Sequence, residues 1–104
     1  MKTITEQLIA EKELLSDPSR WTKGEVARDS NGKLVETESA TAVCWCQLGA
    51  SMKLQSTWRV LSIKKSISTN YNFFSSLGFN DHPDTTHSDL MKFYDECIKE
   101  SKRV

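Results

Sequence analysis

Two cysteines around a tryptophan, with two histidines later in the chain, have the residue types of a zinc site. Thiolates from Cys44 and Cys46 and imidazoles from His82 and His87 are ligands that zinc accepts. In a helix, residues i and i+2 point about 200° apart, so both thiols could not face one metal. If residues 42–48 formed a buried strand, the thiols would share a face and this objection would lapse. We expect no bound metal, no cofactor and buried, inert cysteines.

A second chemistry would use a cysteine as nucleophile. Cys44 would lie near the start of a helix, where the helix dipole lowers the pKa of a thiol. His87 could then act as base, with Asp81 or Asn80 orienting it. No glycine-rich oxyanion loop flanks Cys44 or Cys46. A thiol- or metal-dependent enzyme built around these residues is therefore the alternative to a non-enzymatic protein.

The middle of the chain carries positive charge without acids. No Asp or Glu occurs between residues 38 and 81, and the cations in this stretch are Lys53, Arg59, Lys64 and Lys65. We expect Arg59, Lys64 and Lys65 to form a cationic patch that contacts an acidic protein surface. With Trp58 beside them, the same residues also suit a nucleotide or RNA, which is a third hypothesis. The plainer interpretation is a solvated helix face.

The tryptophans differ in their expected surroundings. Trp45 and Trp58 fit the core, whereas Trp21 follows a loop and could be half exposed. Because tryptophan is enriched in interfaces, Trp21, Arg28 and the nearby hairpin tip form a second candidate partner surface.

Composition restricts the class of protein. The 104 residues include 14 Lys+Arg, 14 Asp+Glu and 38% hydrophobic residues, which predicts one globular domain spanning residues 1–104. Zero net charge argues against a dedicated DNA-binding domain. An odd count of three cysteines favours a reducing cytosol, and we expect no signal peptide and no membrane span. The expected location is therefore the cytoplasm, with no membrane partner.

The elements that would position these residues begin with a helix. Thr3 and Glu6 match a capping box, and Pro18 stops the helix that follows. The apolar face of this helix comprises Ile4, Leu8 and Leu15. Glu11 is expected to point outward. Residues 21–28 and 33–36 then fit the arms of a β-hairpin around Asn-Gly turn chemistry.

The second half favours helices. Residues 39–52 form an almost uncharged run that predicts a central buried helix capped by Ser39. Gly49 within it suggests that another backbone passes closely. Helical spacing continues through residues 58–74 with a break near 68–70, followed by an αL glycine at Gly78 and a loop over 80–84.

The last helix has the clearest signals. Thr86 and Asp89 match an N-cap with an acid in the first turn. Its buried stripe comprises Leu90, Phe93, Tyr94, Cys97 and Ile98. The chain as a whole predicts a mainly helical α+β fold, with about four helical segments and a β-hairpin inserted after the first.

Several short motifs occur here in the order in which they recur in one family. They are W-T-K-G at 21–24, A-R-D at 27–29, W-C-Q-L-G-A at 45–50, F-N-D at 79–81 and T-H at 86–87. Over residues 6–98 the chain resembles a small domain of unknown function found in bacteria and their phages. It departs around residues 53–70, which are richer in Ser and Lys. The resemblance implies no activity, and a phage or mobile-element setting would favour an accessory protein that modulates a host component.

The sequence therefore predicts a small cytosolic binding protein, phage or mobile-element related, that occupies a surface on a partner protein. We expect it to be a monomer or a homodimer and not an enzyme.

Overall fold

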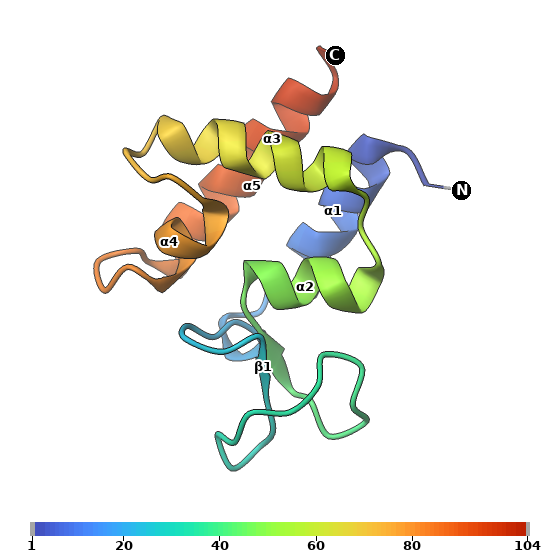
Figure 1. The fold of residues 1–104 in the computed structure, drawn as a ribbon, viewed down its shortest axis with the longest axis vertical. Coiled ribbons are helices and arrows are strands. Elements are labelled where there is room, and N and C mark those ends of the chain that lie inside the picture. Colours follow the sequence, from blue (N-terminus) through green and yellow to red (C-terminus); the bar gives the residue numbers. More distant parts are fainter. Residues whose placement is uncertain (1, 104) are drawn as a thin grey trace.

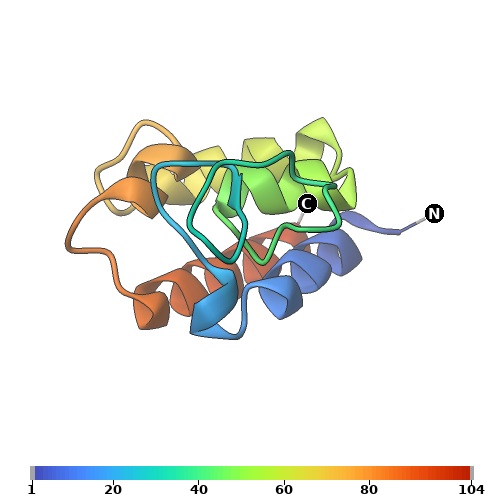
Figure 2. The same cartoon turned by 90° about the horizontal axis from the view of Figure 1, so that it is seen from below.

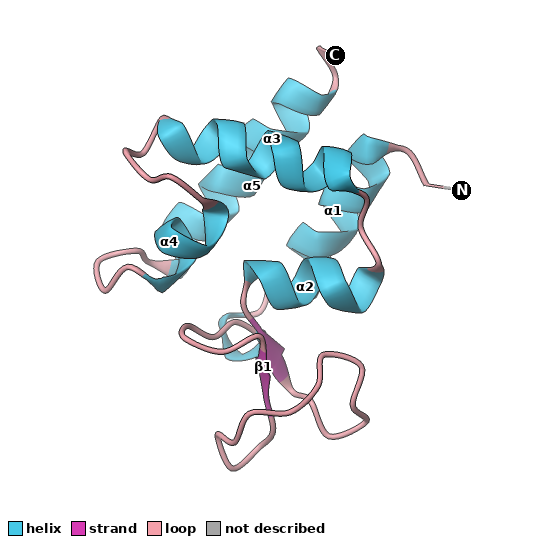
Figure 3. Cartoon of the chain, viewed as in Figure 1, coloured by secondary structure: helices cyan, strands magenta, loops and turns pink. Residues whose placement is uncertain are grey.

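The computed structural model describes residues 2–103, which form a mainly helical α+β fold (Figure 3). Its helices are α1 (Ile4–Leu14), α2 (Gln47–Leu54), α3 (Trp58–Thr69), α4 (Ser76–Asp81) and α5 (His87–Ser101). A short 3-10 helix, η1 (Pro18–Arg20), follows α1, and the two strands are β1 (Ala27–Arg28) and β2 (Cys44–Trp45). The predicted fold class is thus confirmed.

The helices lie in two layers, with α1 and α5 side by side in one and α2, α3 and α4 in the other (Figure 2). The core fills the space between the layers, where the rings of Phe79 and Phe93 stack with centroids 4.8 Å apart. The small sheet and its loops project from one end of the molecule, beyond α2 (Figure 1). Among residues 2–103, no helix has the length and apolar character that crossing a membrane requires.

Local signals place the first and last helices. Capping boxes at Thr3–Glu6 and Thr86–Asp89 are both formed, each with reciprocal bonds between side chain and backbone. The last helix buries Leu90, Phe93, Tyr94 and Cys97, as its spacing predicts. Because caps and helical spacing involve residues a few positions apart, the sequence is sufficient to locate these helices.

The predicted hairpin is only partly correct. Its turn is formed, with Gly32 at φ 79° and the Asp29 amide donating to the Lys33 carbonyl at 2.9 Å. The second arm contributes only an isolated bridge between Arg28 and Leu34. The main partner of β1 is β2, which runs antiparallel to it.

The predicted helix over residues 39–52 is wrong in its first half. Cys44 and Trp45 form β2, and α2 begins after Cys46, whose Sγ accepts a hydrogen bond from the Gly49 amide at 3.3 Å. An uncharged run fits a buried strand as well as a buried helix, and pairing with β1 selects the strand. The expected close approach at Gly49 is confirmed, because a Cβ there would overlap the Val26 carbonyl.

The segment after α3 also differs from the prediction. The α3 helix ends at Thr69 as expected, but Gly78 lies inside α4 without a positive φ, and residues 80 and 81 are helical. Ser75 caps this helix by accepting from the Gly78 amide at 3.1 Å, and α4 buries Phe79. Burial of one aromatic side chain therefore maintains a helix too short for its sequence to reveal.

Candidate functional site

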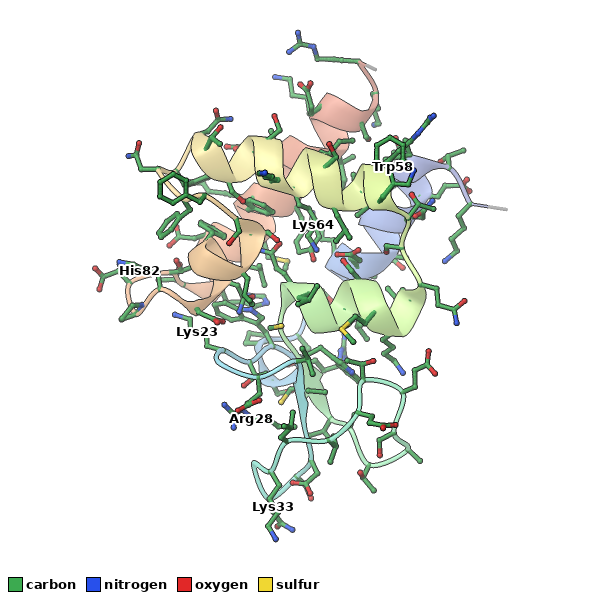
Figure 4. The ribbon with its side chains drawn as sticks, viewed as in Figure 1. Lys23, Arg28, Lys33, Trp58, Lys64 and His82 are labelled. Atoms are coloured by element: carbon green, nitrogen blue, oxygen red, sulfur yellow. The ribbon has the colours of Figure 1, made fainter. Side chains whose placement is uncertain are left out.

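The outward face of α3 presents an exposed tryptophan beside free cations. Trp58 is 71% exposed, so its predicted place in the core is wrong, whereas Trp45 is buried as predicted. Trp58 opens α3 and points about 200° away from Val60, which faces the core, so the helix turns it toward solvent. Figure 4 shows it at the end of α3 near the N-terminus.

A shallow hollow lies at the foot of this tryptophan. It measures about 350 Å³ and is lined by Ile4, Trp58, Arg59, Ser62 and Ile63. The Arg59 guanidinium lies 5.4 Å from the centroid of the Trp58 ring, within the range of a cation–π interaction. Gln7 of α1 anchors the start of α3 by accepting from the Thr57 amide at 2.8 Å. We call Trp58, Arg59, Lys65 and this hollow the α3 surface.

The α3 surface is positive because its helix contains no acid. Arg59 and Lys65 are exposed, and neither forms an ion pair with any carboxylate of residues 2–103. The spacing brings Lys65 to the same side as Trp58, since seven residues complete nearly two turns. These two of the three predicted cations therefore remain available to a partner.

Lys64 does not belong to this surface, and its predicted role as a contact cation is wrong. Its side chain is fully buried and its Nζ lies 2.8 Å from Oε1 of Glu11, which is also buried rather than outward as predicted. The ammonium donates further bonds to the Gln47 carbonyl at 3.1 Å and the Ser51 hydroxyl at 2.8 Å. Figure 4 shows Lys64 pointing into the space between the helices.

The acid of this pair is held by several donors. The hydroxyls of Tyr94, Ser51 and Ser56 each donate to the Glu11 carboxylate at 2.7 Å. Burial raises the pKa of Glu11, but the Lys64 ammonium and the hydrogen bonds from Ser56 and Ser51 outweigh it and leave the pKa below its ordinary value of 4.5. We call Glu11, Lys64, Ser51, Ser56 and Tyr94 the buried polar cluster.

A sequence signal for the buried polar cluster does exist. Glu11 lies three residues after Leu8, and Lys64 lies four residues after Val60, so each shares the apolar stripe of its helix. Two opposite charges on facing stripes indicate a buried pair rather than two solvated side chains. Spacing places Glu11 and Lys64 on apolar stripes, and their opposite charges indicate that the two side chains pair.

The second predicted surface is largely occupied within the chain. The Arg28 guanidinium donates to the Thr22 hydroxyl and to the carbonyls of Lys23 and Gly32, at 2.9–3.0 Å. Trp21 is half-buried, and its Nε1 donates to Asn80 at 2.6 Å. Both side chains therefore have structural partners, and their role in partner binding stays a prediction.

The cysteines and histidines that suggested chemistry are not assembled as one site. The Nε2 atom of His87 lies 2.7 Å from the Leu15 carbonyl, while Nδ1 of His82 accepts from the Asp84 amide at 3.1 Å. Within residues 2–103, no group of three or more His, Cys, Asp or Glu side chains could hold a metal ion. Burial also raises the pKa of the Cys46 thiol, which is the opposite of nucleophile activation.

The fold and the α3 surface define a small, mainly helical α+β domain that presents an exposed tryptophan on a helix face without acids. The chain belongs to a family of unknown function, DUF6197, whose model matches residues 1–100. No curated protein and no solved structure matches it.

Proposed function

We propose that this protein is a small non-enzymatic binding protein that occupies an acidic surface of a partner protein through its α3 surface. The observation that carries the proposal is Trp58, a large aromatic side chain that is 71% exposed on a helix without acids. Tryptophan and arginine are the residues most often found as binding hot spots. The adjacent hollow offers an apolar contact beneath the ring.

The proposal extends to the setting of the protein. A cytoplasmic location and a phage or mobile-element origin would suit an accessory protein that modulates a host component. Membership in a family of unknown function is consistent with this role and assigns no activity. The enzyme alternative takes second place because Cys44 lies in β2 and not in the first turn of a helix, and because burial raises the pKa of the Cys46 thiol.

The partner can be captured from the α3 surface itself. A photoreactive benzoylphenylalanine at Ser62, which lines the hollow, should crosslink the partner in cells. Benzoylphenylalanine in place of Lys92, an exposed residue of α5, is the control. The affinity for the crosslinked protein is then measured by calorimetry.

Trp58→Ala should weaken that binding by about 30-fold, which corresponds to a loss of about 2 kcal/mol. Arg59→Ala and Lys65→Ala should weaken it less, whereas exposed Phe74→Ala should leave it unchanged. Lys64 is left intact, because its removal would disturb the fold. Undiminished binding by the triple variant Trp58→Ala, Arg59→Ala, Lys65→Ala would refute the proposal, and crosslinking to RNA would favour the nucleic-acid hypothesis instead.

A further inference from the structure

The segment that follows the hairpin turn forms a free edge of the small sheet. Leu34 pairs with Arg28 in an antiparallel bridge that is flanked by two backbone bonds. These join the Asp29 amide to the Lys33 carbonyl and the Val35 amide to the Ala27 carbonyl, at 2.9 and 3.1 Å. In this pattern the N–H and C=O groups of Leu34 itself point away from β1.

Three outward backbone groups of this edge are unpaired in the described part of the chain, whereas the Glu36 carbonyl accepts from the Ser39 amide at 3.0 Å. Within residues 2–103, the Leu34 amide and carbonyl and the Glu36 amide take part in no hydrogen bond. The Leu34 segment lies on one side of β1 and β2 lies on the other, so the outer side of the Leu34 segment is a free edge. An exposed edge with free donors and acceptors is a template for an added strand.

An apolar groove lies directly beside the edge. It has a volume of about 670 Å³ and is lined by Val26, Leu34, Val35, Glu36, Thr37, Glu38 and Met52. Leu34 is 58% exposed and Met52, on α2, is 49% exposed. Such a groove can take the side chains that alternate along an extended peptide.

The charge of the groove indicates which peptide would fit. Glu36 and Glu38 are exposed, and neither forms an ion pair with a described cation. They contrast with the α3 surface, which has no acid. Figure 4 places Lys33, at the start of the edge, at the opposite end of the molecule from Trp58. The two surfaces can therefore be tested separately.

We propose that a partner protein adds an extended segment to the Leu34–Glu36 edge as a new strand. Its backbone bonds to the free groups of Leu34 and Glu36, and an apolar side chain enters the groove. Lysine or arginine side chains two positions before and after it, which lie on the same face of the added strand, contact Glu36 and Glu38. This recognition is independent of the α3 surface and gives the protein a second, acidic docking site.

The test uses a blocked peptide in which lysine, valine and lysine occupy every second position, with threonine between them, observed through the amide NMR spectrum of the protein. Binding should shift the resonances of Leu34 and Glu36 and slow hydrogen exchange at the Leu34 amide. A peptide with alternate backbone nitrogens methylated keeps the side chains but loses the donors, so it should not bind. The corresponding peptide with glutamate in place of each lysine should also fail to bind.

Substitutions test the contribution of the two glutamates to peptide binding separately from that of the backbone edge. Glu36→Gln with Glu38→Gln should weaken binding of the lysine peptide by about fivefold, as expected for two exposed charge pairs. Exposed Glu13→Gln on α1 is the matched control and should have no effect. Failure of the lysine peptide to bind, or equal binding of the methylated peptide, would overturn the proposal. Protection of Leu34 that rises with protein concentration alone would overturn it too, because a second copy would then occupy the edge.

Discussion

The ion pair between Glu11 and Lys64 contains two charges that are both fully removed from water. Desolvation of each charge is costly, and this cost is offset only when every donor and acceptor has a partner. Here Tyr94, Ser51 and Ser56 complete the coordination of the carboxylate. The buried polar cluster therefore joins α1, α2, α3 and α5 through one carboxylate, and each member depends on the others.

Removing one charge should be far more damaging than removing both. Lys64→Met leaves the Glu11 carboxylate buried and unpaired, and we expect it to lower the free energy of unfolding by about 3–5 kcal/mol. The double variant Glu11→Leu, Lys64→Met should recover much of that loss, as measured by urea unfolding. A double variant as unstable as the single one would contradict this account of the pair.

The same pair predicts a dependence on pH. Because the pKa of Glu11 is below its ordinary value of 4.5 in the folded protein, its stabilising contribution is complete well above that value and is lost as the pH falls through the folded pKa. The fall in unfolding free energy below pH 4.5 should thus be shallower in the double variant. The pKa values of Glu6, Asp17 and Asp89 are also lowered. They affect the wild-type protein and the double variant equally, so they cancel when the two pH profiles are subtracted.

Cysteine reactivity distinguishes core packing from catalysis. Burial raises the pKa of Cys46, and it raises that of Cys97 to about 12. We expect iodoacetamide at pH 8 to leave both thiols unlabelled in the native protein and to label them fully in urea, as read by peptide mass spectrometry. Rapid native labelling of Cys46 would return the enzyme hypothesis to first place.

At the scale of elements, the contact of α2 with the chain before β1 depends on a missing side chain. Gly49 lets the helix rest on the Val26 backbone, where a Cβ would overlap the carbonyl oxygen. Glycine lowers helix propensity by about 1 kcal/mol relative to alanine. The close packing of α2 on Val26 therefore stabilises the protein by more than glycine costs in helix propensity.

Two glycine substitutions should consequently have opposite effects. Gly49→Ala should destabilise the protein by about 3 kcal/mol, because the backbone of Val26 must move. Gly78→Ala is the matched control within α4, since its Cβ would meet only ordinary contacts at 3.5 and 3.7 Å. It should stabilise by about 1 kcal/mol. Equal shifts of the urea midpoint would refute the argument.

At the scale of the whole molecule, Asn80 connects the sheet region to the helices. Its Oδ1 accepts from Trp21 Nε1 and from the Gln47 amide, and its Nδ2 donates to the Thr22 carbonyl. The side chain is buried, so these bonds are shielded from water. Three motif segments that are far apart in the sequence thus meet at the side-chain amide of Asn80. They are residues 21–24, 45–50 and 79–81.

Loss of the Asn80 side-chain amide should destabilise the sheet region before the rest of the molecule. Asn80→Ala leaves buried donors unsatisfied, at a cost of about 1–3 kcal/mol for each. We expect hydrogen exchange to accelerate over residues 21–28 and 44–46 before it does in α1 and α5. Exposed Asn70→Ala should leave exchange unchanged, and uniform acceleration along the chain would show that Asn80 has no such localised role.

Several predictions failed where the local structure depends on residues that are far away in the sequence. The strand at Cys44 and Trp45 depends on pairing with β1, about 16 residues earlier, and an apolar run alone does not reveal that pairing. Trp58 is hydrophobic enough for a core, but its position on α3 directs it to solvent. The candidate cations were found from their sequence, yet only two of the three are exposed.

Features that depend on residues close together in the chain could be predicted from the sequence. These are the capping boxes of α1 and α5, the Asn-Gly turn, the mainly helical class and the positive stretch without acids. Which charges meet and which side chains remain in water depends instead on how the helices pack. The reason is that burial depends on the summed contacts of all packed elements, so Lys64 and Lys65, adjacent in sequence, have opposite environments.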